Sequence, residues 1–269
     1  MPEEYKQKVI DFFNGRTAYD REGDSHMREA KRLLEYVVVR SGQTILDLAT
    51  GTGLVAIPAA KAVAPQGSVI GVDMSPGMLA QAKNKIVTEK IDNLELIEAD
   101  VESINFKSEQ FDLIFCCSAL VYITDIPVII NKCYDWLKLG GGFAFTTPDR
   151  TSYLAAIKVK VCQDLFGIDL PHILRPLWTP EKCHTILQNS GFKDITIDSY
   201  QYRYNIAKNC QDGATRIERD FYPRGNPLLN LSEAQKQLLQ VEYKKTVEQL
   251  IEKRGVWQDA NNLYVKAWK

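Results

Sequence analysis

Short apolar segments alternate with helix-like segments between residues 44 and 147, and this alternation restricts the possible folds more than any other feature of the sequence. Segments 44–48, 68–73, 94–97, 111–117 and 143–147 have the length and composition of strands. The fourth of them, FDLIFCC, is a nearly continuous apolar run, which is typical of a strand buried on both faces of a parallel sheet. The alternation predicts an α/β fold with a doubly wound, mostly parallel sheet.

The connections between these segments carry helix signals. Leu54–Val63 is rich in alanine. Ser75 followed by Pro76 predicts a capped helix that extends to about Glu89, and 126–137 predicts another helix. In a sheet of this kind the ligand site lies at the carboxyl ends of the strands, near the point where the strand order reverses. We therefore expect functional residues just after the strands.

The flanking segments predict further helices and two more strands. Expected helices are 5–13, 25–40 with Ser25 as a candidate cap, a stretch near 151–167, one that begins at Thr179-Pro180, and one from Ser232 to about Lys253. Expected strands are Ile195–Tyr200 and Asn262–Trp268.

Composition limits the class of function. Among 269 residues, 33 Lys and Arg balance 34 Asp and Glu, for a formal net charge of −1. A dedicated nucleic-acid-binding protein usually carries a basic excess, so we expect no nucleic-acid partner. The 6 cysteines form no C-x-x-C pair, which predicts reduced thiols and no metal site. The charged start, MPEEYKQKVIDFF, lacks the apolar stretch of a signal peptide, and no apolar run is long enough for a membrane helix, so we expect a cytoplasmic protein.

The segment DLATGTG joins the first strand to the next helix. Its glycines allow a sharp turn and a close approach of the backbone to a ligand. Gly51, Gly53 and Ala56 also fit the dinucleotide-binding fingerprint, and Asp73 ends the second strand where a carboxylate would bind ribose hydroxyls. NAD-dependent enzymes share both features, so these alone leave the cofactor open.

Two further carboxylates separate the alternatives. Asp47 lies within the first strand, where a dinucleotide fold usually has an apolar residue, and it would suit a ligand ammonium. Asp100 directly follows the third strand and can accept a hydrogen bond from an adenine amine while Val101 packs on the ring. About 40 residues precede the first strand, more than in many dinucleotide domains. Acidic ends for an ammonium, a ribose and an adenine fit S-adenosylmethionine better than NAD.

Four segments in this order, ILDLATGTGLVAI, VIGVDMSPGML, IEADVESINF and FDLIFCCSALVYITD, resemble the class I S-adenosylmethionine-dependent methyltransferases. Within that family the chain is similar to the UbiE-type branch, which acts on small molecules, over roughly residues 36–150. The resemblance implies that these residues bind S-adenosylmethionine: Tyr19, Asp47, Gly51, Gly53, Asp73, Met74, Asp100, Val101 and Ser118. It places the glycines under the methionyl end, Asp47 beside the loop or the ammonium, Met74 on the adenine, and Tyr19 over the cofactor.

The same resemblance implies a seven-stranded sheet of order 3-2-1-4-5-7-6 with the last strand antiparallel. About 60 residues separate the two final strands, where a short hairpin often suffices. We expect a single domain over 1–269 with a cofactor-binding core at 36–150, N-terminal helices, and a helical cap over the acceptor site at 151–178 and 201–253.

Methyl transfer from a sulfonium is an in-line displacement, so the protein mainly aligns the reactants. A base is needed only if the acceptor loses a proton. Tyr122, just after the fourth strand, and His172, in the expected cap, are candidate catalytic and substrate-binding residues, and Arg175 is a candidate partner for an acidic acceptor. The alternatives are a tyrosine at the rim, a structural histidine and a surface arginine.

The sequence thus predicts a methyltransferase that acts on a small metabolite or natural-product intermediate. We favour O-methylation and leave C- and N-methylation open. An NAD(P)-dependent oxidoreductase is the alternative enzyme, and a non-catalytic subunit that binds S-adenosylmethionine is the alternative without turnover. An RNA methyltransferase would be expected to have an Asn/Asp-Pro-Pro-aromatic motif after the fourth strand, where this chain has CSAL. Oligomeric state is left open.

Overall fold

The computed structural model describes residues 2–150, 152, 155–206, 221–249, 251–252 and 255–269. Its sheet has the strand order β3-β2-β1-β4-β5-β8-β6, and the short strand β7 (Ile251–Glu252) pairs with β8. Strands β1 to β5 pair in parallel, and β8 runs antiparallel to β5, β6 and β7. The predicted doubly wound fold is confirmed. The predicted order 3-2-1-4-5-7-6 is also confirmed, and β8 is the strand that the prediction numbers 7.

The central strands are the most buried. The strands are β1 (Thr44–Leu48), β2 (Ser68–Asp73), β3 (Leu94–Glu98), β4 (Phe111–Cys116), β5 (Leu137–Pro148), β6 (Lys193–Ile206) and β8 (Gly255–Trp268). In β1 every residue after Thr44 is buried, and in β4 every residue except Asp112. The apolar run at 111–117 is therefore a central strand covered on both faces, as the sequence predicts.

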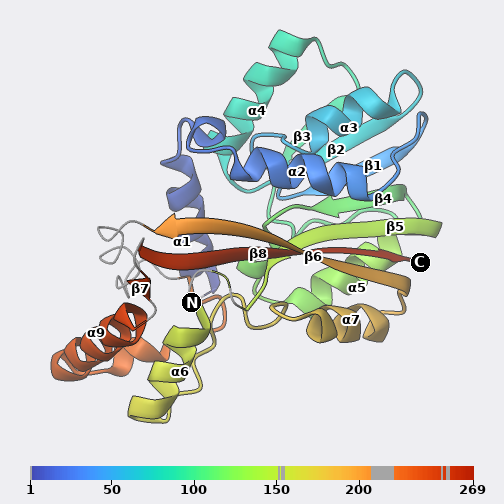
Figure 1. Ribbon diagram of the computed structural model, residues 1–269. Coiled ribbons are helices and arrows are strands. Elements are labelled where there is room, and N and C mark those ends of the chain that lie inside the picture. The colour runs from blue at the N-terminus through green and yellow to red at the C-terminus, as the bar shows by residue number, and fades with distance from the viewer. Residues whose placement is uncertain (1, 151, 153–154, 207–220, 250, 253–254) are drawn as a thin grey trace.

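Helices cover both faces of the sheet. They are α1 (Pro2–Asn14), α2 (Ser25–Tyr36), α3 (Ala56–Val63), α4 (Pro76–Glu89), α5 (Ile126–Trp136), α6 (Ala155–Phe166), α7 (Pro180–Asn189) and α9 (Glu233–Glu248). Figure 1 shows α2, α3 and α4 on one side of the sheet and α5 and α7 on the other. Each face has its own apolar cluster, with Leu33 of α2 and Phe115 of β4 in one, and Ile129 of α5 and Phe143 of β5 in the other.

The predicted helix starts at Ser75 and Thr179 are confirmed. Ser75 Oγ accepts the backbone N–H of Met78, and Thr179 Oγ1 accepts that of Lys182; a proline follows each cap. The predicted helix 25–40 does begin at Ser25, but Asp24 rather than Ser25 occupies the cap position, and α2 stops at Tyr36, four residues earlier than predicted. Three consecutive valines follow Tyr36, and β-branched side chains favour the extended backbone found there.

The final strands are longer than the sequence indicates. β5 begins at Leu137, six residues before the predicted start at 143, and therefore includes the three consecutive glycines 140–142. A Cβ added to Gly142 would lie 2.8 Å from the Trp268 ring, so glycine lets β8 approach β5 there. β6 extends to Ile206 and β8 begins at Gly255, so residues 201–206 belong to the sheet, although we assigned them to the cap.

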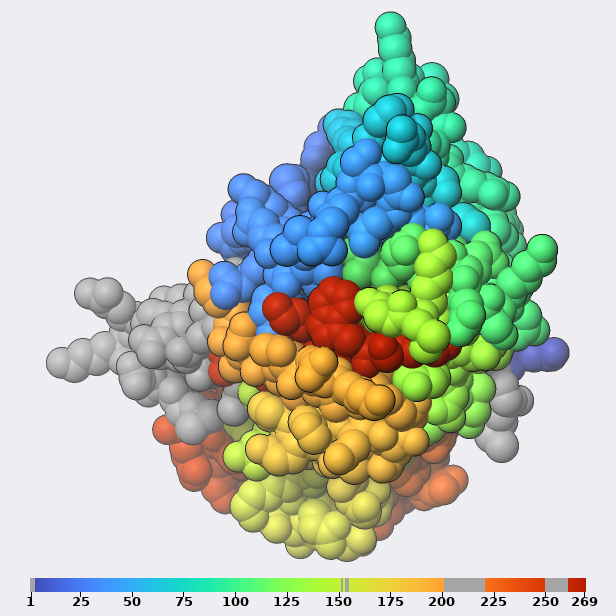
Figure 2. All heavy atoms as spheres, turned by 90° about the vertical axis from the view of Figure 1, so that its right-hand side faces the viewer, coloured from blue at the N-terminus to red at the C-terminus, as the bar shows by residue number. Residues whose placement is uncertain are grey.

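A second small core joins the helices of the expected cap. Cys162 of α6 and Leu239 of α9 belong to one buried apolar cluster together with Tyr222 and Leu228 from the segment before α9. Figure 1 shows α6 and α9 together at one end of the molecule, away from the C-terminus. Figure 2 shows the opposite end, where the C-terminal residues lie between α2 and the α7–β6 region.

Within the described residues, no helix combines the length and apolarity needed to cross a bilayer. The same residues contain no group of three or more His, Cys, Asp or Glu side chains arranged to hold a metal ion.

The packing of α2 on the sheet generates a stability prediction. Leu33 is fully buried, whereas Leu139 is 79% exposed, so Leu33→Ala and Leu139→Ala form a matched pair. Leu33→Ala is expected to lower the free energy of unfolding by about 2–5 kcal/mol, because it leaves a cavity in the core. Leu139→Ala should change it by less than about 0.5 kcal/mol. Urea titration of both variants measures the difference; equal losses would contradict the assigned packing.

Candidate functional site

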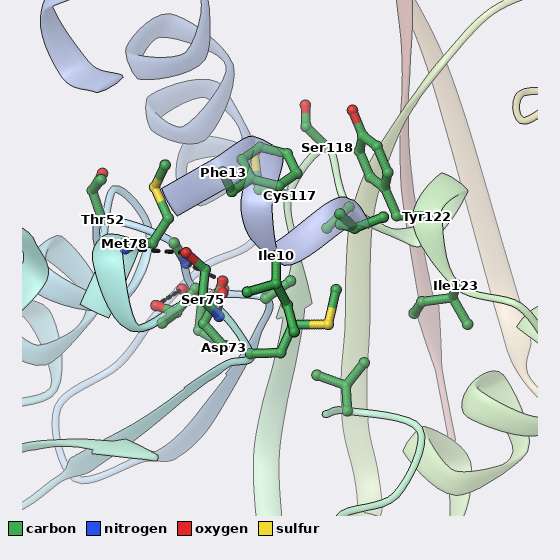
Figure 3. Close-up of a pocket in the computed structure, with 18 of the residues that line it drawn as sticks. Ile10, Phe13, Thr52, Asp73, Ser75, Met78, Cys117, Ser118, Tyr122 and Ile123 are labelled. Atoms are coloured by element: carbon green, nitrogen blue, oxygen red, sulfur yellow. Dashed lines mark hydrogen bonds between the residues drawn. The ribbon is translucent and has the colours of Figure 1, made fainter. Parts of the chain in front are cut away.

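A cavity of about 1080 Å³, which includes its open mouth, lies at the carboxyl ends of the parallel strands. Most of the residues predicted to bind a cofactor or acceptor line it: Tyr19, Asp47, Gly51, Asp73, Met74, Asp100, Val101, Ser118 and Tyr122. Figure 3 shows Thr52, Asp73, Ser75 and Met78 on one side and Ser118, Tyr122 and Ile123 on the other, with Ile10 and Phe13 of α1 between them. The cavity is thus bounded by the strand ends and by α1.

Asp73 holds the glycine loop in place. Its Oδ2 accepts the backbone N–H of Gly51 at 2.8 Å, and its Oδ1 accepts that of Ser75 at 2.8 Å. Gly51 has φ +55°, and a Cβ added to it would meet no atom within 4 Å. Burial raises the pKa of Asp73, and the backbone N–H groups of Ser75, Gly51 and Met74 act against that rise. A carboxylate held in this way keeps lone pairs for the hydroxyls of a ligand.

Asp47 is buried at the end of β1, where it orients the loop. Its Oδ2 accepts the hydroxyl proton of Thr50 at 2.6 Å, and the backbone N–H of Ala56, the first residue of α3, also donates to it. Burial raises the pKa of Asp47 to about 7, and the nearby Asp73 adds to this shift. A cation in the cavity would favour the ionised form of Asp47.

Asp100 and Glu102 share one cation from α1. Lys6 Nζ lies 2.5 Å from Asp100 Oδ2 and 3.0 Å from Glu102 Oε2. Glu102 also accepts the hydroxyl of Thr124 and the N–H of Asp125. Although burial opposes ionisation, these hydrogen bonds and Lys6 hold the pKa of Glu102 below its usual value. Lys6 of α1 therefore pairs with the third acidic strand end, a contact that the sequence alone did not indicate.

Aromatic side chains form the wall around Tyr122. Its ring lies 5.5 Å from that of Phe13 and 5.4 Å from that of Phe221, edge to face in both cases. The hydroxyl of Tyr5 donates to the carbonyl of Tyr122 at 2.9 Å. Tyr19 stacks on His26, with 4.8 Å between the ring centroids. Such a wall suits a flat, apolar ligand more than a highly charged one.

Three predicted site residues do not line this cavity. Gly53 has φ +79°, and a Cβ there would lie 3.0 Å from Ile57, so it serves the turn between loop and helix. His172 lies in the segment between α6 and α7, where its Nδ1 accepts the N–H of Leu174 at 3.3 Å. Arg175 pairs with Asp169 at 2.5 Å and donates to the carbonyl of Leu170.

The surroundings of His172 are cationic. Burial, together with Lys158, Arg224 and Arg175, lowers the pKa of His172 to about 4, so its ring is neutral at pH 7. Arg224 donates to the carbonyls of both His172 and Ile173. The described structure does not bring His172 to the cofactor side, and its role in catalysis stays a prediction.

Helix α1 contributes to the cavity, which we did not predict from the sequence. Lys6, Val9, Ile10 and Phe13 all line it. Their spacing gives α1 one apolar face with a lysine at its edge, which is the pattern of a helix that packs over a pocket. We predicted the helix but did not assign that face to the site.

The lining fits S-adenosylmethionine by its chemistry. The carboxylates at the ends of β1 and β2, and Asp100 just after β3, face a common space, and Met74 and Val101 supply apolar surface beside them. Asp73 would hold the ribose hydroxyls, Asp100 the adenine amine, and Asp47 would act near the ammonium. Among the described lining residues, Lys6 is the one lysine or arginine, and it is already paired with two carboxylates.

Comparison with known proteins agrees with this assignment. Residues 45–141 match the family model of a methyltransferase domain. Over 146 residues, 54% of this chain and 66% of the relative, the chain is 31% identical to aklanonic acid methyltransferase DauC of Streptomyces sp. strain C5. It is 32% identical to demethylmenaquinone methyltransferase of Staphylococcus carnosus over 51% of this chain and 58% of the relative. The matched part thus spans about two thirds or less of these relatives.

A solved structure shows the same fold. Phosphoethanolamine N-methyltransferase 2 of Haemonchus contortus, in complex with phosphomonomethylethanolamine and S-adenosylhomocysteine, superposes with a TM-score of 0.55 at 22% identity, over 90% of this chain and 52% of that chain. The predicted methyltransferase domain and its fold are confirmed by these matches. S-adenosylmethionine is assigned as the cofactor by the lining of the cavity.

The position of Asp73 generates a binding prediction. Asp73→Asn keeps the shape of the side chain but replaces one acceptor oxygen with an amide. It is expected to weaken S-adenosylhomocysteine binding by roughly 1–3 kcal/mol, because a buried donor then lacks its acceptor. Asp112→Asn is the control. Asp112 lies at the start of β4, away from the cavity, and accepts hydrogen bonds from the N–H of Thr44 and the ammonium of Lys138. Calorimetric titration should show weaker binding in the first variant only.

The raised pKa of Asp47 generates a second prediction. An ammonium beside Asp47 favours the carboxylate, so binding lowers its pKa and releases a proton. With a free-state pKa of about 7, up to about half a proton leaves at pH 7. Titrations with S-adenosylhomocysteine in phosphate and in Tris measure this release from the difference in heat. Asp47→Asn should abolish it; an unchanged release would assign the proton to another group.

Proposed function

We propose that this chain, a class I S-adenosylmethionine-dependent methyltransferase by its fold and its core domain, transfers a methyl group to a small-molecule acceptor. The observation that carries the proposal is the convergence of Asp47, Asp73 and Asp100 on one cavity. Residues 45–141, which match the methyltransferase family model, include all three strand ends.

The alternative cofactor, NAD(P), fits the cavity less well. A pyrophosphate needs donors and positive charge, but the lining described here carries Asp47, Asp73, Asp100 and Glu102. Lys6 is the nearby cation, and its ammonium is engaged by two of those carboxylates. The acidic lining favours the positively charged methyl donor, and this also argues against a dinucleotide oxidoreductase.

The residues of the cavity would act mainly by orientation. When bound, S-adenosylmethionine supplies an electrophilic methyl group. Asp73 and the loop at Gly51 would hold its ribose end, while α1 excludes water through Ile10 and Phe13. Alignment of two reactants in this way can contribute about 7–11 kcal/mol to lowering a barrier. No metal is needed for these roles.

The acceptor is an apolar, ring-containing molecule in this proposal. Phe13, Tyr122 and Ile123 border the side of the cavity away from Asp73. The matched relatives are named for aklanonic acid and demethylmenaquinone, so a quinone-like or natural-product acceptor is compatible with both the wall and the relatives. We favour transfer to oxygen; transfer to carbon or nitrogen is the alternative.

A panel assay tests the function. The purified chain is incubated with S-adenosylmethionine and alizarin, juglone or dihydroxynaphthoate, and mass spectrometry follows both S-adenosylhomocysteine and a product one methyl group heavier. At least one aromatic acceptor is expected to be methylated, and Asp73→Asn should lower the rate. In parallel, calorimetry compares S-adenosylhomocysteine with NADH.

Each contrary result selects a different alternative. Binding of NADH without S-adenosylhomocysteine would support an oxidoreductase. Binding of S-adenosylhomocysteine with no methylation of any acceptor would support a non-catalytic subunit. Methylation at a carboxylate would support the methyltransferase proposal but contradict the favoured hydroxyl acceptor.

A further inference from the structure

A fully buried acid lies directly behind the cavity wall. Glu29 of α2 is 4% exposed, and its Oε1 accepts the hydroxyl proton of Ser118 at 2.6 Å. Ser118 lines the cavity just after β4. Thr146 of β5 and Asn262 of β8 also make side-chain hydrogen bonds to Glu29. One carboxylate thus joins α2 to β5, to β8 and, through Ser118, to the cavity lining.

The partners of Glu29 in these bonds are all neutral. Burial of a carboxylate without a cation is costly, and burial accordingly raises the pKa of Glu29. A glutamine would accept the same hydroxyl and would tie α2 to the sheet without placing a charge in the core. An anchoring role alone therefore does not account for an acid at this position.

Ser118 is held in an unusual conformation at the same point. Its φ is +54°, and its backbone N–H donates to Thr146 Oγ1 at 2.8 Å. With its own proton directed at Glu29, the Ser118 oxygen has lone pairs left to accept a hydrogen bond. The Ser118 hydroxyl is thus arranged to accept a proton on one side and to donate one on the other.

We propose that Ser118 and Glu29 form a proton relay in the cavity wall, in which Ser118 Oγ takes the proton of an acceptor hydroxyl and passes its own proton to the Glu29 carboxylate. Ser118 contacts the acceptor, and Glu29 acts through Ser118. The inference rests on the proposed methyl transfer and deepens it, because it assigns the acceptor to molecules with an ionisable hydroxyl group, such as phenols.

The relay balances in atoms and charge. The acceptor O–H bond and the Ser118 O–H bond break, and new O–H bonds form at Ser118 Oγ and Glu29 Oε1. The acceptor oxygen uses the released electron pair to bond the methyl carbon, whose bond to sulfur breaks with its pair returning to sulfur. One sulfonium and one carboxylate are replaced by a neutral thioether and a neutral carboxylic acid, so the buried charge is removed during the step.

Asn262 allows the cluster to hold the proton. Asn262 is buried, and its Oδ1 has no hydrogen-bond partner in the part of the chain that the structure describes. Its amide bonds to the ionised Glu29. A half-turn of the amide would present Oδ1 to the protonated carboxyl, so both states of Glu29 would be hydrogen-bonded.

Neighbouring groups do not obscure the titration of Glu29. Burial raises the pKa of both Cys117 on β4 and Tyr19 before α2, so both are neutral near pH 7. On β8, Lys266 donates to the carbonyl of Tyr36. On α2, burial lowers the pKa of His26, and Arg32 lies over the Tyr200 ring. Asp47 acts electrostatically on Cys117, and because burial raises the pKa of Asp47 to about 7 it is tested by its own variant.

A spectroscopic experiment tests the relay without turnover. Alizarin changes colour when its phenol ionises, so it is titrated over a range of pH with the full chain saturated with S-adenosylhomocysteine. In the wild type the bound dye should ionise at least about one pH unit below free alizarin, a tenfold change in its ionisation constant. Glu29→Gln and Ser118→Ala should each abolish that shift. Glu35→Gln, an exposed change on the same helix, should retain it.

Single-turnover kinetics with alizarin give the second readout. Glu29→Gln should lower the methylation rate by about 10²–10⁴-fold with little change in the apparent KM, and the acidic limb of its pH profile should disappear, whereas Asp47→Asn should keep that limb. The double variant with Ser118→Ala should be no slower than either single variant, because both act in one relay.

Several outcomes would overturn the relay while leaving the methyltransferase proposal intact. The first is that bound alizarin ionises at the same pH in Glu29→Gln and in the wild type. The second is that the pH profile of the methylation rate in Glu29→Gln equals that of the wild type. The third is that the chain methylates only carboxylates and does not bind alizarin. Circular dichroism confirms that each variant is folded, and S-adenosylhomocysteine affinity confirms that the Glu29→Gln variant still binds this ligand. If the wild-type chain did not bind S-adenosylhomocysteine, the proposed function itself would be rejected.

Discussion

One buried carboxylate sets the geometry on which the site depends. Asp73 ends β2, yet its two oxygens accept backbone N–H groups from the loop after β1 and from the cap of α4. Three elements that are separate in the sequence are thereby fixed relative to one another. Burial acts against the charge of this carboxylate, and the surrounding N–H groups stabilise it. The same side chain therefore shapes the loop and faces the cavity, which couples local folding to ligand binding.

The strand ends were predictable because their signals are local. A parallel α/β sheet brings its carboxyl ends together, so Asp47, Asp73 and Asp100 could be assigned to one site from their positions at or just after the strand ends, and the family resemblance added Ser118. The structure places all four on the cavity. The length of β6 was not predictable, because residues beyond Tyr200 form a strand through pairing with β8, 50 to 60 residues later.

The contacts that α1 and α2 make with the strand ends could not be predicted from the sequence. Lys6 binds Asp100 across 94 residues, and Ser118 reaches Glu29 across 89. Periodicity indicates that each helix has an apolar face, but it does not say which strand end that face meets. His172 shows the converse. It was assigned from its place in the expected cap, but in the structure it bonds to the N–H of Leu174 among nearby cations and does not line the cavity.

The position of β8 between β5 and β6 has a consequence for synthesis. Among the strands that the structure describes, β6 pairs only with β8, so it cannot join the sheet until β8 has been made. The strands from β1 to β5 pair with one another and can associate while the ribosome is still translating the rest. Because contacts distant in sequence form slowly, the half that carries the cofactor loop should assemble first and wait for β8 to close the sheet. During that interval the free edge of β5 is a site at which chaperones would act.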